Sequence, residues 1–398
     1  MVFNIVKGVL IIKPNNLNKR LKVLHLITDL DTGGAEMMLC KLVQNMDVGC
    51  FENVVVSILD KGKLEPCFKS TGVRVYNLGF EKAIDDILGF YRLIRIISME
   101  KPDLLQTWLY HADFLGTLIS RLFRIPLVWN IRCSNMNLKN YSKLTAWVVG
   151  WCAKRSLRPH AIIVNSETGK SFHINMGYHP REWTVIPNGF DLDRFRHDES
   201  CGNIIKQELN LSEEVTLIGL VARYDPMKDH RCFILAANHL IRNMNLGNHV
   251  RFILVGKGIN TDNKYVTSMI KDLDLEDYFY LLGERKDIPA IMSALDVYCS
   301  TSAYGEGFPN VIGEAMSCGI PCVVTDVGDS SFVVGDTGRV IPPGDYKLIA
   351  EAIGDLIRLE KLERQRIGEQ ARKRMEELFS IEEITKQYEV LYHKLIYS

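Results

Sequence analysis

The sequence predicts an α/β fold of two similar domains, each built on a parallel sheet. Short apolar runs of strand length alternate with helical segments along most of the 398 residues. One charged stretch with little strand signal, Asp193 to Glu214, interrupts the alternation. The length suits two domains of about 200 residues each. We therefore expect two doubly wound, Rossmann-like domains with helices on both faces of each sheet and a cleft between them.

The first domain is predicted to span residues 21–187, after an N-terminal extension of residues 1–20. Each of its strands is a short run rich in apolar residues. These strands are Lys22–Thr28, Val54–Leu59, Val73–Leu78, Leu104–Trp108, Leu127–Ile131, Ala161–Val164 and Thr184–Pro187. Helices with apolar positions at helical spacing are predicted at Ala35–Met46, Ala83–Glu100 and Tyr110–Phe123.

Turn-forming residues at Ile186 to Asp191 end this first series, and we place a linker at residues 188–214. The second domain is predicted to span residues 215–380. Its strands are Val215–Ala222, Arg251–Val255, Phe279–Leu282, Leu295–Cys299, Cys322–Thr325 and Gly338–Ile341. The last segment, residues 381–398, is predicted to be a helix with an apolar stripe.

The composition argues against several classes of protein. Lys plus Arg and Asp plus Glu number 48 each, so the charge gives no support for nucleic-acid binding. No apolar run reaches about 18 residues, so no transmembrane helix is expected. The apolar start lacks a basic beginning and a cleavage site, which argues against a signal peptide. The ten cysteines show no zinc spacing, and we expect reduced, mostly packed thiols in a cytoplasmic protein.

The most informative stretch runs from Ser300 to Asp326 and holds two glutamates, Glu306 and Glu314, with seven residues between them. Glycines flank Glu306 and allow tight turns in a loop that follows an apolar strand. Pro309 suits the first position of a helix that we predict from Asn310 to Ser317. The loop would then lie at the carboxyl end of a strand, where open α/β sheets bind ligands.

This pattern suits a sugar nucleotide. Unpaired N–H groups at the helix start, near Asn310 and Val311, can hold a phosphate. Glu314 can accept hydrogen bonds from two ribose hydroxyls, while Glu306 can reach the side of the phosphate where a sugar would lie. The alternative is a solvated loop carboxylate and a surface ion pair. The Gly-Phe-Pro-Asn sequence between the two glutamates favours the ligand site.

Cations follow two other strands of the second domain. Arg223 and Lys228 lie in the loop after its first strand and could neutralise a diphosphate, although a solvated loop explains them equally well when they are read alone. Arg285 follows the strand Phe279–Leu282 and could line a nucleobase pocket.

Two features of the first domain also lie at strand ends. Gly33 and Gly34 form a turn between a strand and a helix, where backbone can closely approach an anion. The three-glycine dinucleotide fingerprint is absent, which argues against a dehydrogenase. His111 follows the strand that ends at Trp108, and taken alone it is better explained as a capping or packed residue.

The segment from Lys139 to Arg158 mixes tryptophans with cations. One interpretation is a surface helix that lies on an anionic membrane. The other is a helix that packs Leu144, Val148 and Trp151 inward and leaves its lysines in solvent, and general experience favours this second interpretation.

Together these residues resemble the retaining GT-B glycosyltransferases of family 4, over about residues 21–380 and in the family's order. The resemblance implies two Rossmann-like domains that face each other across a cleft. It also implies an N-terminal acceptor domain, a C-terminal nucleotide-sugar donor domain, and a final helix that crosses back to the first domain. The family often builds bacterial surface polysaccharides on lipid-linked acceptors.

The resemblance also implies roles for single residues. Gly33 and Gly34 would touch the donor phosphate. In the E-x7-E motif, Glu306 would face the sugar and Glu314 would bind the ribose. The catalytic candidates are His111, Glu306, Arg223 and Lys228. With the pocket positions argued above, the candidate donor-binding residues are Gly33, Gly34, Arg223, Lys228, Arg285, Glu306, Phe308, Pro309, Asn310, Val311 and Glu314.

Two positions depart from the family pattern. Ala222 replaces the glycine before the arginine, and Asp229 replaces the glycine after the lysine, where it could change the charge or turn of the loop. Asp29 and Asp31 have the spacing of a metal-binding Asp-x-Asp, but that motif belongs to the other glycosyltransferase fold. We expect no essential metal and no cofactor, with a nucleotide diphosphate sugar as co-substrate.

The reaction implied is metal-independent, retaining transfer of a sugar to an acceptor hydroxyl, with a lipid-linked glycan intermediate of O-antigen, capsule or exopolysaccharide biosynthesis as the acceptor. Trp108, Tyr110 and Arg132 would face the acceptor. The protein would be cytoplasmic, and a peripheral contact with the inner membrane is left open. The alternatives are a nucleotide-sugar epimerase of the same fold and a non-catalytic partner subunit.

Overall fold

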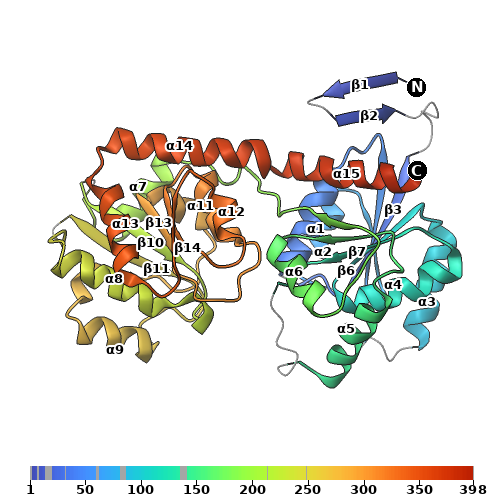
Figure 1. Cartoon of the computed structure of the whole chain (residues 1–398), viewed down its shortest axis with the longest axis horizontal. Helices are drawn as coiled ribbons and strands as arrows, with labels where there is room; N and C mark the ends of the chain where they lie inside the picture. The colour runs from blue at the N-terminus through green and yellow to red at the C-terminus, as the bar shows by residue number, and fades with distance from the viewer. Residues whose placement is uncertain are drawn as a thin grey trace. The chain divides into compact units, whose positions relative to one another are not determined.

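The computed structural model describes residues 2–6, 9–13, 20–31, 33–59, 62–80, 87–134, 141–212, 214–247 and 249–397. The chain divides into two compact units (Figure 1). Unit 1 consists of Met1–Gly189 with Ile381–Ser398, and unit 2 consists of Phe190–Ser380. Both are Rossmann-like α/β units with a parallel sheet, as the sequence predicts.

The sheet of unit 1 has seven strands among the described residues, in the order β5-β4-β3-β6-β7-β8-β9, and all its pairs are parallel. Its strands are β3 (Leu21–Ile27), β4 (Phe51–Ser57), β5 (Arg74–Asn77), β6 (Leu104–Trp108), β7 (Leu127–Ile131), β8 (Ala161–Val164) and β9 (Trp183–Val185). Its helices are α1 (Gly34–Asn45), α2 (Glu65–Ser70), α3 (Ile87–Glu100), α4 (Tyr110–Phe123), α5 (Lys143–Arg155), α6 (Glu167–Asn175) and α15 (Ile381–Tyr397).

The sheet of unit 2 has six strands in the described part of the chain, in the order β12-β11-β10-β13-β14-β15, again all parallel. Its strands are β10 (Thr216–Val221), β11 (Val250–Val255), β12 (Phe279–Leu281), β13 (Val297–Ser300), β14 (Cys322–Thr325) and β15 (Arg339–Ile341). Its helices are α7 (Glu199–Glu208), α8 (His230–Arg242), α9 (Lys264–Asp272), α10 (Ile288–Ala294), α11 (Asn310–Ser317), α12 (Ser330–Val334), α13 (Tyr346–Arg358) and α14 (Lys361–Leu378).

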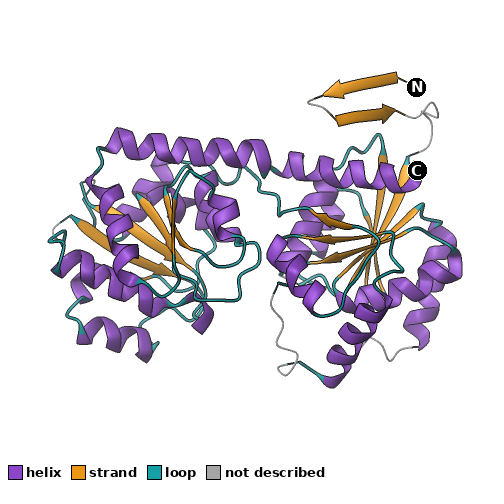
Figure 2. Cartoon of the chain, viewed as in Figure 1, coloured by secondary structure: helices purple, strands orange, loops and turns teal. Residues whose placement is uncertain are grey.

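Helices cover both faces of each sheet, so each unit has two apolar cores (Figure 2). In unit 1, Leu115 of α4 and Val148 of α5 belong to the core on one face, while Met38 of α1 and Ile384 of α15 belong to the core on the other. This double burial explains why the strands are continuous apolar runs rather than alternating ones.

Both sheets reverse their strand order next to their first strand. In unit 1 the reversal lies between β3 and β6, and in unit 2 it lies between β10 and β13. At such a point the loops after the two strands diverge to opposite faces and leave a crevice at the carboxyl edge. Gly33 and His111 follow the strands at the first reversal, and Lys228 and Glu306 follow those at the second.

The C-terminal helix α15 packs on the sheet of unit 1. The Tyr388 ring stacks on Trp108 with centroids 6.4 Å apart, and its hydroxyl accepts a hydrogen bond from the Asn130 amide at 3.0 Å. Tyr392 donates to the side-chain oxygen of Gln106. These buried contacts attach the last residues of the chain to strands β6 and β7.

The structure differs from the prediction between the two series of strands. The residues predicted as a linker, 188–214, include α7, and their larger part belongs to unit 2. Phe195, Ile205 and Leu209 are buried in its core. The charges that suggested a linker lie partly in the loop before α7, as Asp193, Arg194 and Arg196, and partly on α7 itself, as Glu199 and Glu208.

In the predicted N-terminal extension, β1 (Val2–Val6) and β2 (Val9–Lys13) form an antiparallel pair. Of the helix predicted at Ala83–Glu100, residues 83–86 lie outside the described residues, and α3 begins at Ile87.

The prediction that all cysteines are reduced is wrong for Cys40 and Cys67, which form a disulfide between α1 and α2. Their separation of 27 residues carries no recognisable spacing, and only the packing of the two helices brings the sulfur atoms together. Cys152, Cys299 and Cys322 are buried free thiols, as expected.

None of the helices in the described residues is both long enough and apolar enough to cross a membrane.

Candidate active site

A cavity of about 210 Å³ lies in unit 2 at the carboxyl ends of β10 and β13. Its wall comes from these two strand ends, the loops that follow them and the start of α11. The lining residues are Leu220, Val221, Ala222, Lys228, Tyr298, Ser300, Thr301, Ser302, Glu306, Phe308, Pro309, Asn310, Val311 and Ile312. The cavity therefore lies at the reversal of strand order, the usual ligand site of such sheets.

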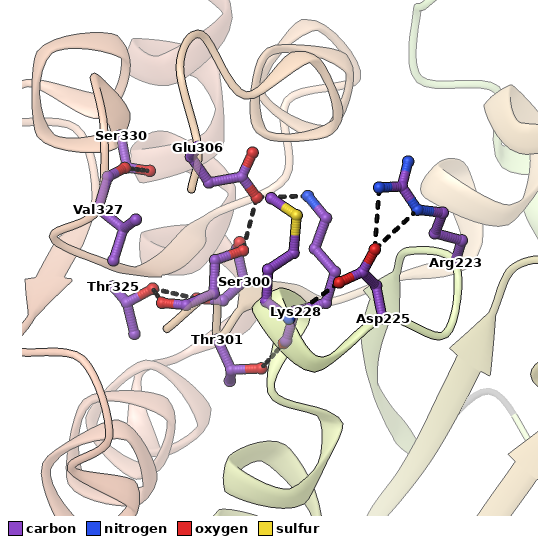
Figure 3. A network of polar contacts seen from close by, with 11 residues as sticks. Arg223, Asp225, Lys228, Ser300, Thr301, Glu306, Thr325, Val327 and Ser330 are labelled. Atoms are coloured by element: carbon purple, nitrogen blue, oxygen red, sulfur yellow. Dashed lines mark hydrogen bonds and ion pairs between the residues drawn. The ribbon is translucent and has the colours of Figure 1, made fainter. Parts of the chain in front are cut away.

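Glu306 and Lys228 form an ion pair in this cavity, and Figure 3 shows Lys228 pointing toward the carboxylate. Lys228 Nζ and the Ser302 hydroxyl both donate to Glu306 Oε1, the latter at 2.6 Å. Glu306 is only 9% exposed, and a buried carboxylate needs such partners to remain charged. Because both donors bind Oε1, the other oxygen can accept a hydrogen bond from a ligand.

Hydroxyl groups fix the two loops that carry this ion pair. Thr301 Oγ1 donates to the backbone oxygens of Lys228 and Asp229, at 2.9 and 3.0 Å. Thr325 Oγ1 donates to the backbone oxygen of Ser302 at 2.6 Å. Sequence reasoning did not select these residues, nor Ser302. The run of hydroxyl residues directly after the strand, next to Glu306, was the available signal.

Two glycines let the loop around Glu306 fold tightly. Gly305 has a φ of 79°, a conformation that favours glycine. Gly328 has a φ of 63°, and a Cβ there would lie 2.5 Å from the backbone oxygen of Glu306. The segment after β14 therefore packs directly against the backbone of Glu306, and only glycine leaves enough space at position 328.

Helix α11 has the predicted bounds, Asn310–Ser317, but Pro309 is its N-cap residue rather than its first helical residue. The first N–H groups of a helix have no partner inside the helix, and no side chain caps them from Pro309. Asn310 and Val311 line the cavity, so backbone N–H groups at this helix start can donate to a bound anion. Glu314, one turn further, is half-buried and does not line the cavity.

The two arginines of unit 2 that are predicted to bind the donor are each paired with carboxylates. Arg223 is paired with Asp225 at 2.9 Å and remains 62% exposed, so it can reorient toward a ligand (Figure 3). Arg285 is held by Glu208 and Asp287, and these hydrogen bonds raise its pKa. It does not line the cavity, so the structure gives no support for a nucleobase contact.

The two departures from the family pattern have local explanations. Asp229 adopts a φ of 44°, a left-handed conformation that Asp tolerates better than most residues. Its carboxylate also accepts a hydrogen bond from the Cys232 N–H at 3.1 Å and caps α8. Asp229 therefore keeps the turn expected of glycine. Ala222 lines the cavity, where its methyl group is accommodated.

In unit 1, Gly33 and Gly34 stand at the start of α1, with Gly33 as the N-cap. A Cβ on Gly33 would lie 2.2 Å from Glu36 Oε2, whereas the space beside Gly34 is open. Burial raises the pKa of the Glu36 carboxyl, and the nearby Asp29 and Asp31 add to this effect. The predicted glycine turn is thus present, next to a buried carboxyl whose pKa is raised.

His111 lies in the first turn of α4, half-buried, and desolvation lowers the pKa of its imidazole. The residue two positions before it, Leu109, has a φ of 71° and a ψ of 161°. This region is nearly exclusive to glycine, and such strained residues concentrate at functional sites. The strained turn directs the start of α4, and with it His111, from the end of β6.

The structure corrects two of the three predicted acceptor residues. Trp108 is fully buried, donates to His25 Nδ1 at 3.3 Å and stacks on Tyr388. Tyr110 is 6% exposed, and its hydroxyl lies 2.7 Å from His173 Nε2. Both side chains are buried in unit 1. Trp108 belongs to the core on one face of the sheet, and Tyr110 belongs to the core on the other face.

The third, Arg132, is partly accessible and held in place. Its guanidinium donates to Tyr388 Oη at 3.2 Å and to Asn188 Oδ1, and it lies 5.7 Å from the centroid of the Trp108 ring. Burial lowers its pKa, although the group stays charged. A positioned cation therefore lies at the carboxyl end of β7.

In the described ranges, no three His, Cys, Asp or Glu side chains gather into a group that could hold a metal ion.

Sequence models of two glycosyltransferase families match the two units. The model of Glycosyltransferase Family 4 matches residues 32–194, and the model of Glycosyl transferases group 1 matches residues 203–374. Together they cover most of the chain. The chain belongs to glycosyltransferase family 4.

This family 4 chain is 29% identical over 256 residues to a UDP-Gal:α-D-GlcNAc-diphosphoundecaprenol α-1,3-galactosyltransferase of Escherichia coli. The match covers 63% of this chain and 65% of that protein. It is 28% identical to an N-acetyl-α-D-glucosaminyl L-malate synthase of Bacillus anthracis over 48% of this chain and 49% of that protein. It is 25% identical to the capsular polysaccharide biosynthesis glycosyltransferase CapM of Staphylococcus aureus over 78% of this chain and 82% of that protein. The chain thus spans less than two thirds of the length of the first two relatives.

Among solved structures, the family 4 chain matches HepE of Anabaena in complex with UDP, with a TM-score of 0.80 and 24% identity. The match covers 94% of this chain and all of that one. The fold is therefore GT-B.

Proposed function

We propose that this glycosyltransferase transfers a sugar, with retention, from a nucleotide diphosphate sugar to a hydroxyl of a lipid-linked glycan in bacterial polysaccharide biosynthesis. The observation that carries the proposal is the Lys228–Glu306 ion pair in a cavity that the start of α11 also lines. One cavity thus offers a cation and helix N–H groups for a diphosphate and a carboxylate for a sugar. The name of the Escherichia coli relative supports a lipid-linked acceptor, and that of the Staphylococcus aureus relative supports polysaccharide biosynthesis.

The difficult step is the build-up of negative charge on the departing diphosphate. Lys228 has three N–H donors and needs one for Glu306, so two remain for the phosphate oxygens. The start of α11 adds partial positive charge, and Arg223 can swing from Asp225 to the second phosphate. Such positioned donors contribute about 3 kcal/mol each to the barrier reduction.

Glu306 and His111 would act on the sugar. Glu306, fixed by Ser302 and Lys228, can accept a sugar hydroxyl on its remaining oxygen and stabilise positive charge on the ring. His111 has a lowered pKa, so it is neutral near pH 7 and can donate or accept a hydrogen bond without adding charge. Glu314 would bind the ribose, and Gly34 would leave room for a phosphate oxygen.

We propose front-face attack, with the departing phosphate accepting the proton of the acceptor hydroxyl. No covalent nucleophile is assigned to the chain. The C1–O bond to the diphosphate breaks while the acceptor oxygen bonds to C1 from the same side. Retention follows from that geometry. The reaction as proposed needs no metal ion, since Lys228 and the helix N–H groups would neutralise the diphosphate.

A panel of nucleotide sugars with a lipid-linked acceptor, followed by mass spectrometry, tests this function. We expect one donor to give a product, with the α-linkage of an α-configured donor retained in the NMR coupling constant. Chelator should leave the rate unchanged. An inverted linkage would refute front-face attack, and loss of activity in chelator would refute the metal-free reaction. Interconversion of free sugar nucleotides without acceptor would indicate an epimerase instead.

A further inference from the structure

The part of unit 1 that contains α4 and α5 is strongly basic, although the whole chain has equal numbers of acidic and basic residues. From Leu104 to Ser166 the sequence has eight Lys or Arg and one acidic residue, Asp113. Asp113 is fully buried, so its carboxyl is not part of the surface on which the exposed cations lie. The positive charge is therefore uncompensated within this segment.

Apolar side chains are exposed on the same two helices. On α5, Leu144 and Trp147 are 38% and 53% exposed, while Val148, next to Trp147 in the sequence, is fully buried. On α4, Leu118 and Leu122 lie one turn apart and are 40% and 60% exposed. The predicted inward packing of this segment thus holds for Val148 and in part for Trp151, which is half-buried against the same core, but not for Leu144.

The two apolar stripes join into one surface. Helices α4 and α5 pack against each other, and the ring of Phe114 lies 5.6 Å from that of Trp147 and 4.7 Å from that of Trp151. Phe114 precedes Leu118 by one turn of α4. We call this surface the tryptophan face. It consists of Phe114, Leu118, Leu122, Leu144, Trp147 and Trp151.

Cations border the tryptophan face. Lys143, Trp147 and Lys154 are spaced by four and seven residues, so they share one side of α5, and both lysines are exposed. The guanidinium of Arg155 lies 5.8 Å from the centroid of Trp151. Arg121 is exposed on α4 beside Leu122. Apolar rings therefore lie between positive groups rather than beside carboxylates.

We propose that the tryptophan face docks unit 1 onto the surface of an anionic lipid bilayer. Tryptophan prefers the interface between headgroups and acyl chains, where its ring is buried and its N–H stays hydrated. Lysine and arginine beside it attract anionic headgroups. Charge complementarity and the tryptophans favour a bilayer over an acidic protein partner.

This surface begins at the ligand edge of unit 1. Phe114 lies three residues after His111, and Leu144 lies in the first turn of α5, because both helices start at the carboxyl edge of the sheet. Docking would present the headgroup of a lipid-linked acceptor near His111. The inference rests on the proposed function for this purpose, although binding to vesicles can be tested without it.

Flotation of the full chain with vesicles tests the proposal. We expect binding to phosphatidylcholine vesicles that contain phosphatidylglycerol, weak binding to phosphatidylcholine alone, and release at high salt. The exposed pair Lys143→Glu and Lys154→Glu should lower the affinity for anionic vesicles by at least about tenfold. Trp147→Ala should lower it as well. Lys373→Glu in unit 2, whose side chain is 75% exposed, is the control for a charge reversal elsewhere on the surface; it should bind like the wild type, and each single lysine variant is compared with it.

A second control tests whether vesicle binding is specific to the tryptophan face or common to exposed apolar residues. Val390, 49% exposed on α15, lies on a helix that covers the opposite face of the same sheet, so Val390→Ala should bind normally. Circular dichroism and thermal unfolding of the lysine double variant should match the wild type. Binding that ignores lipid charge, or a double variant that binds normally, would overturn the proposal.

Activity distinguishes failure of this inference from failure of the proposed function. With a short-chain, water-soluble acceptor the double variant should be as active as the wild type. With a long-chain acceptor in anionic vesicles it should lose roughly the same factor as in vesicle binding. No transfer by the wild type to any acceptor would refute the proposed function, whereas equal activity of both proteins on vesicles would refute the docking surface.

Discussion

Each unit starts a helix at its ligand edge on a non-glycine residue with positive φ, and the two residues differ in how they tolerate it. Asp229 in unit 2, with φ 44°, occupies the left-handed region that Asp accepts, and its carboxylate caps α8. Leu109 in unit 1, with φ 71° and ψ 161°, occupies a region nearly exclusive to glycine and provides no cap. Asp229 directly follows Lys228, and Leu109 shortly precedes His111.

The two ligand edges are therefore held in place by different interactions. In unit 2 the loop is held by compatible local chemistry: the cap from Asp229, the hydroxyl of Thr301 and the Lys228–Glu306 pair. In unit 1 the turn is strained, and the surrounding core must hold it, chiefly through the burial of Trp108 against Tyr388. The first arrangement leaves a polar signature in the sequence, and the second does not.

Removal of the cation in unit 2 should have the largest effect. Lys228→Ala is expected to lower kcat/KM by about 100- to 1000-fold, because one positioned donor to the leaving group is lost and Glu306 keeps only Ser302. Steady-state kinetics with the preferred donor measures this. Lys271→Ala, on an exposed position of α9, is the control and should retain full activity. Activity of Lys228→Ala within threefold of the control would show that the ion pair is structural only.

The same contrast explains what sequence reasoning could predict. The helix Asn310–Ser317 was predicted with the observed bounds because proline before it and Cys-Gly after it punctuate the chain locally. Glu306 and Lys228 meet because parallel strands bring their carboxyl ends to one edge.

Side-chain direction after a strand is not encoded locally. Trp108 and Tyr110 were predicted at the surface, but α15, almost 300 residues later, covers Trp108. The pairing of Arg285 with Glu208 and the Cys40–Cys67 disulfide likewise depend on helix packing that has no signature in the spacing.

Buried histidines in both units should make stability fall with decreasing pH. Burial lowers the pKa of His25 in unit 1 and of His230 in unit 2 to about 4, from 6.5 in the unfolded chain. The native state therefore binds fewer protons, and stability is lost as pH falls from about 6.5 toward 4. At pH 5 the loss relative to pH 7 is about 2 kcal/mol per histidine.

Urea unfolding at pH 7 and pH 5 measures this loss. His25→Gln and His230→Gln should each reduce the difference between the two pH values by about 2 kcal/mol, whatever they do to stability at pH 7. The difference in unfolding free energy between the two pH values could fall in His230→Gln and stay unchanged in His25→Gln. Water would then reach His25 in the core of unit 1, and the ligand edge of that unit would be less rigid than we infer.

The strain at Leu109 predicts an inverted order of stability for two substitutions. At an ordinary position glycine is less stable than alanine by about 0.5–1 kcal/mol, because it loses more backbone entropy. At Leu109 both variants lose the same apolar contacts, but only glycine relieves the backbone strain. Leu109→Gly should therefore be more stable than Leu109→Ala by roughly 1–2 kcal/mol in urea unfolding. The ordinary order, with alanine above glycine, would show that the turn is not strained.

The corresponding substitutions at Asp229 should have the smallest effect and should complete the comparison. Asp229→Gly keeps the left-handed turn and loses the carboxylate that caps α8, which costs only a few tenths of a kcal/mol. Asp229→Ala loses the cap and also places a Cβ in the left-handed region, so it should cost about 1–2 kcal/mol. Asp229→Asn keeps both features and is the control in the same unfolding measurement.

Because local chemistry holds this turn, glycine should change little here while it stabilises the backbone at Leu109 relative to alanine. A large loss in Asp229→Gly would mean that the carboxylate also positions Lys228, and a matching loss of kcat/KM in that variant would identify this role.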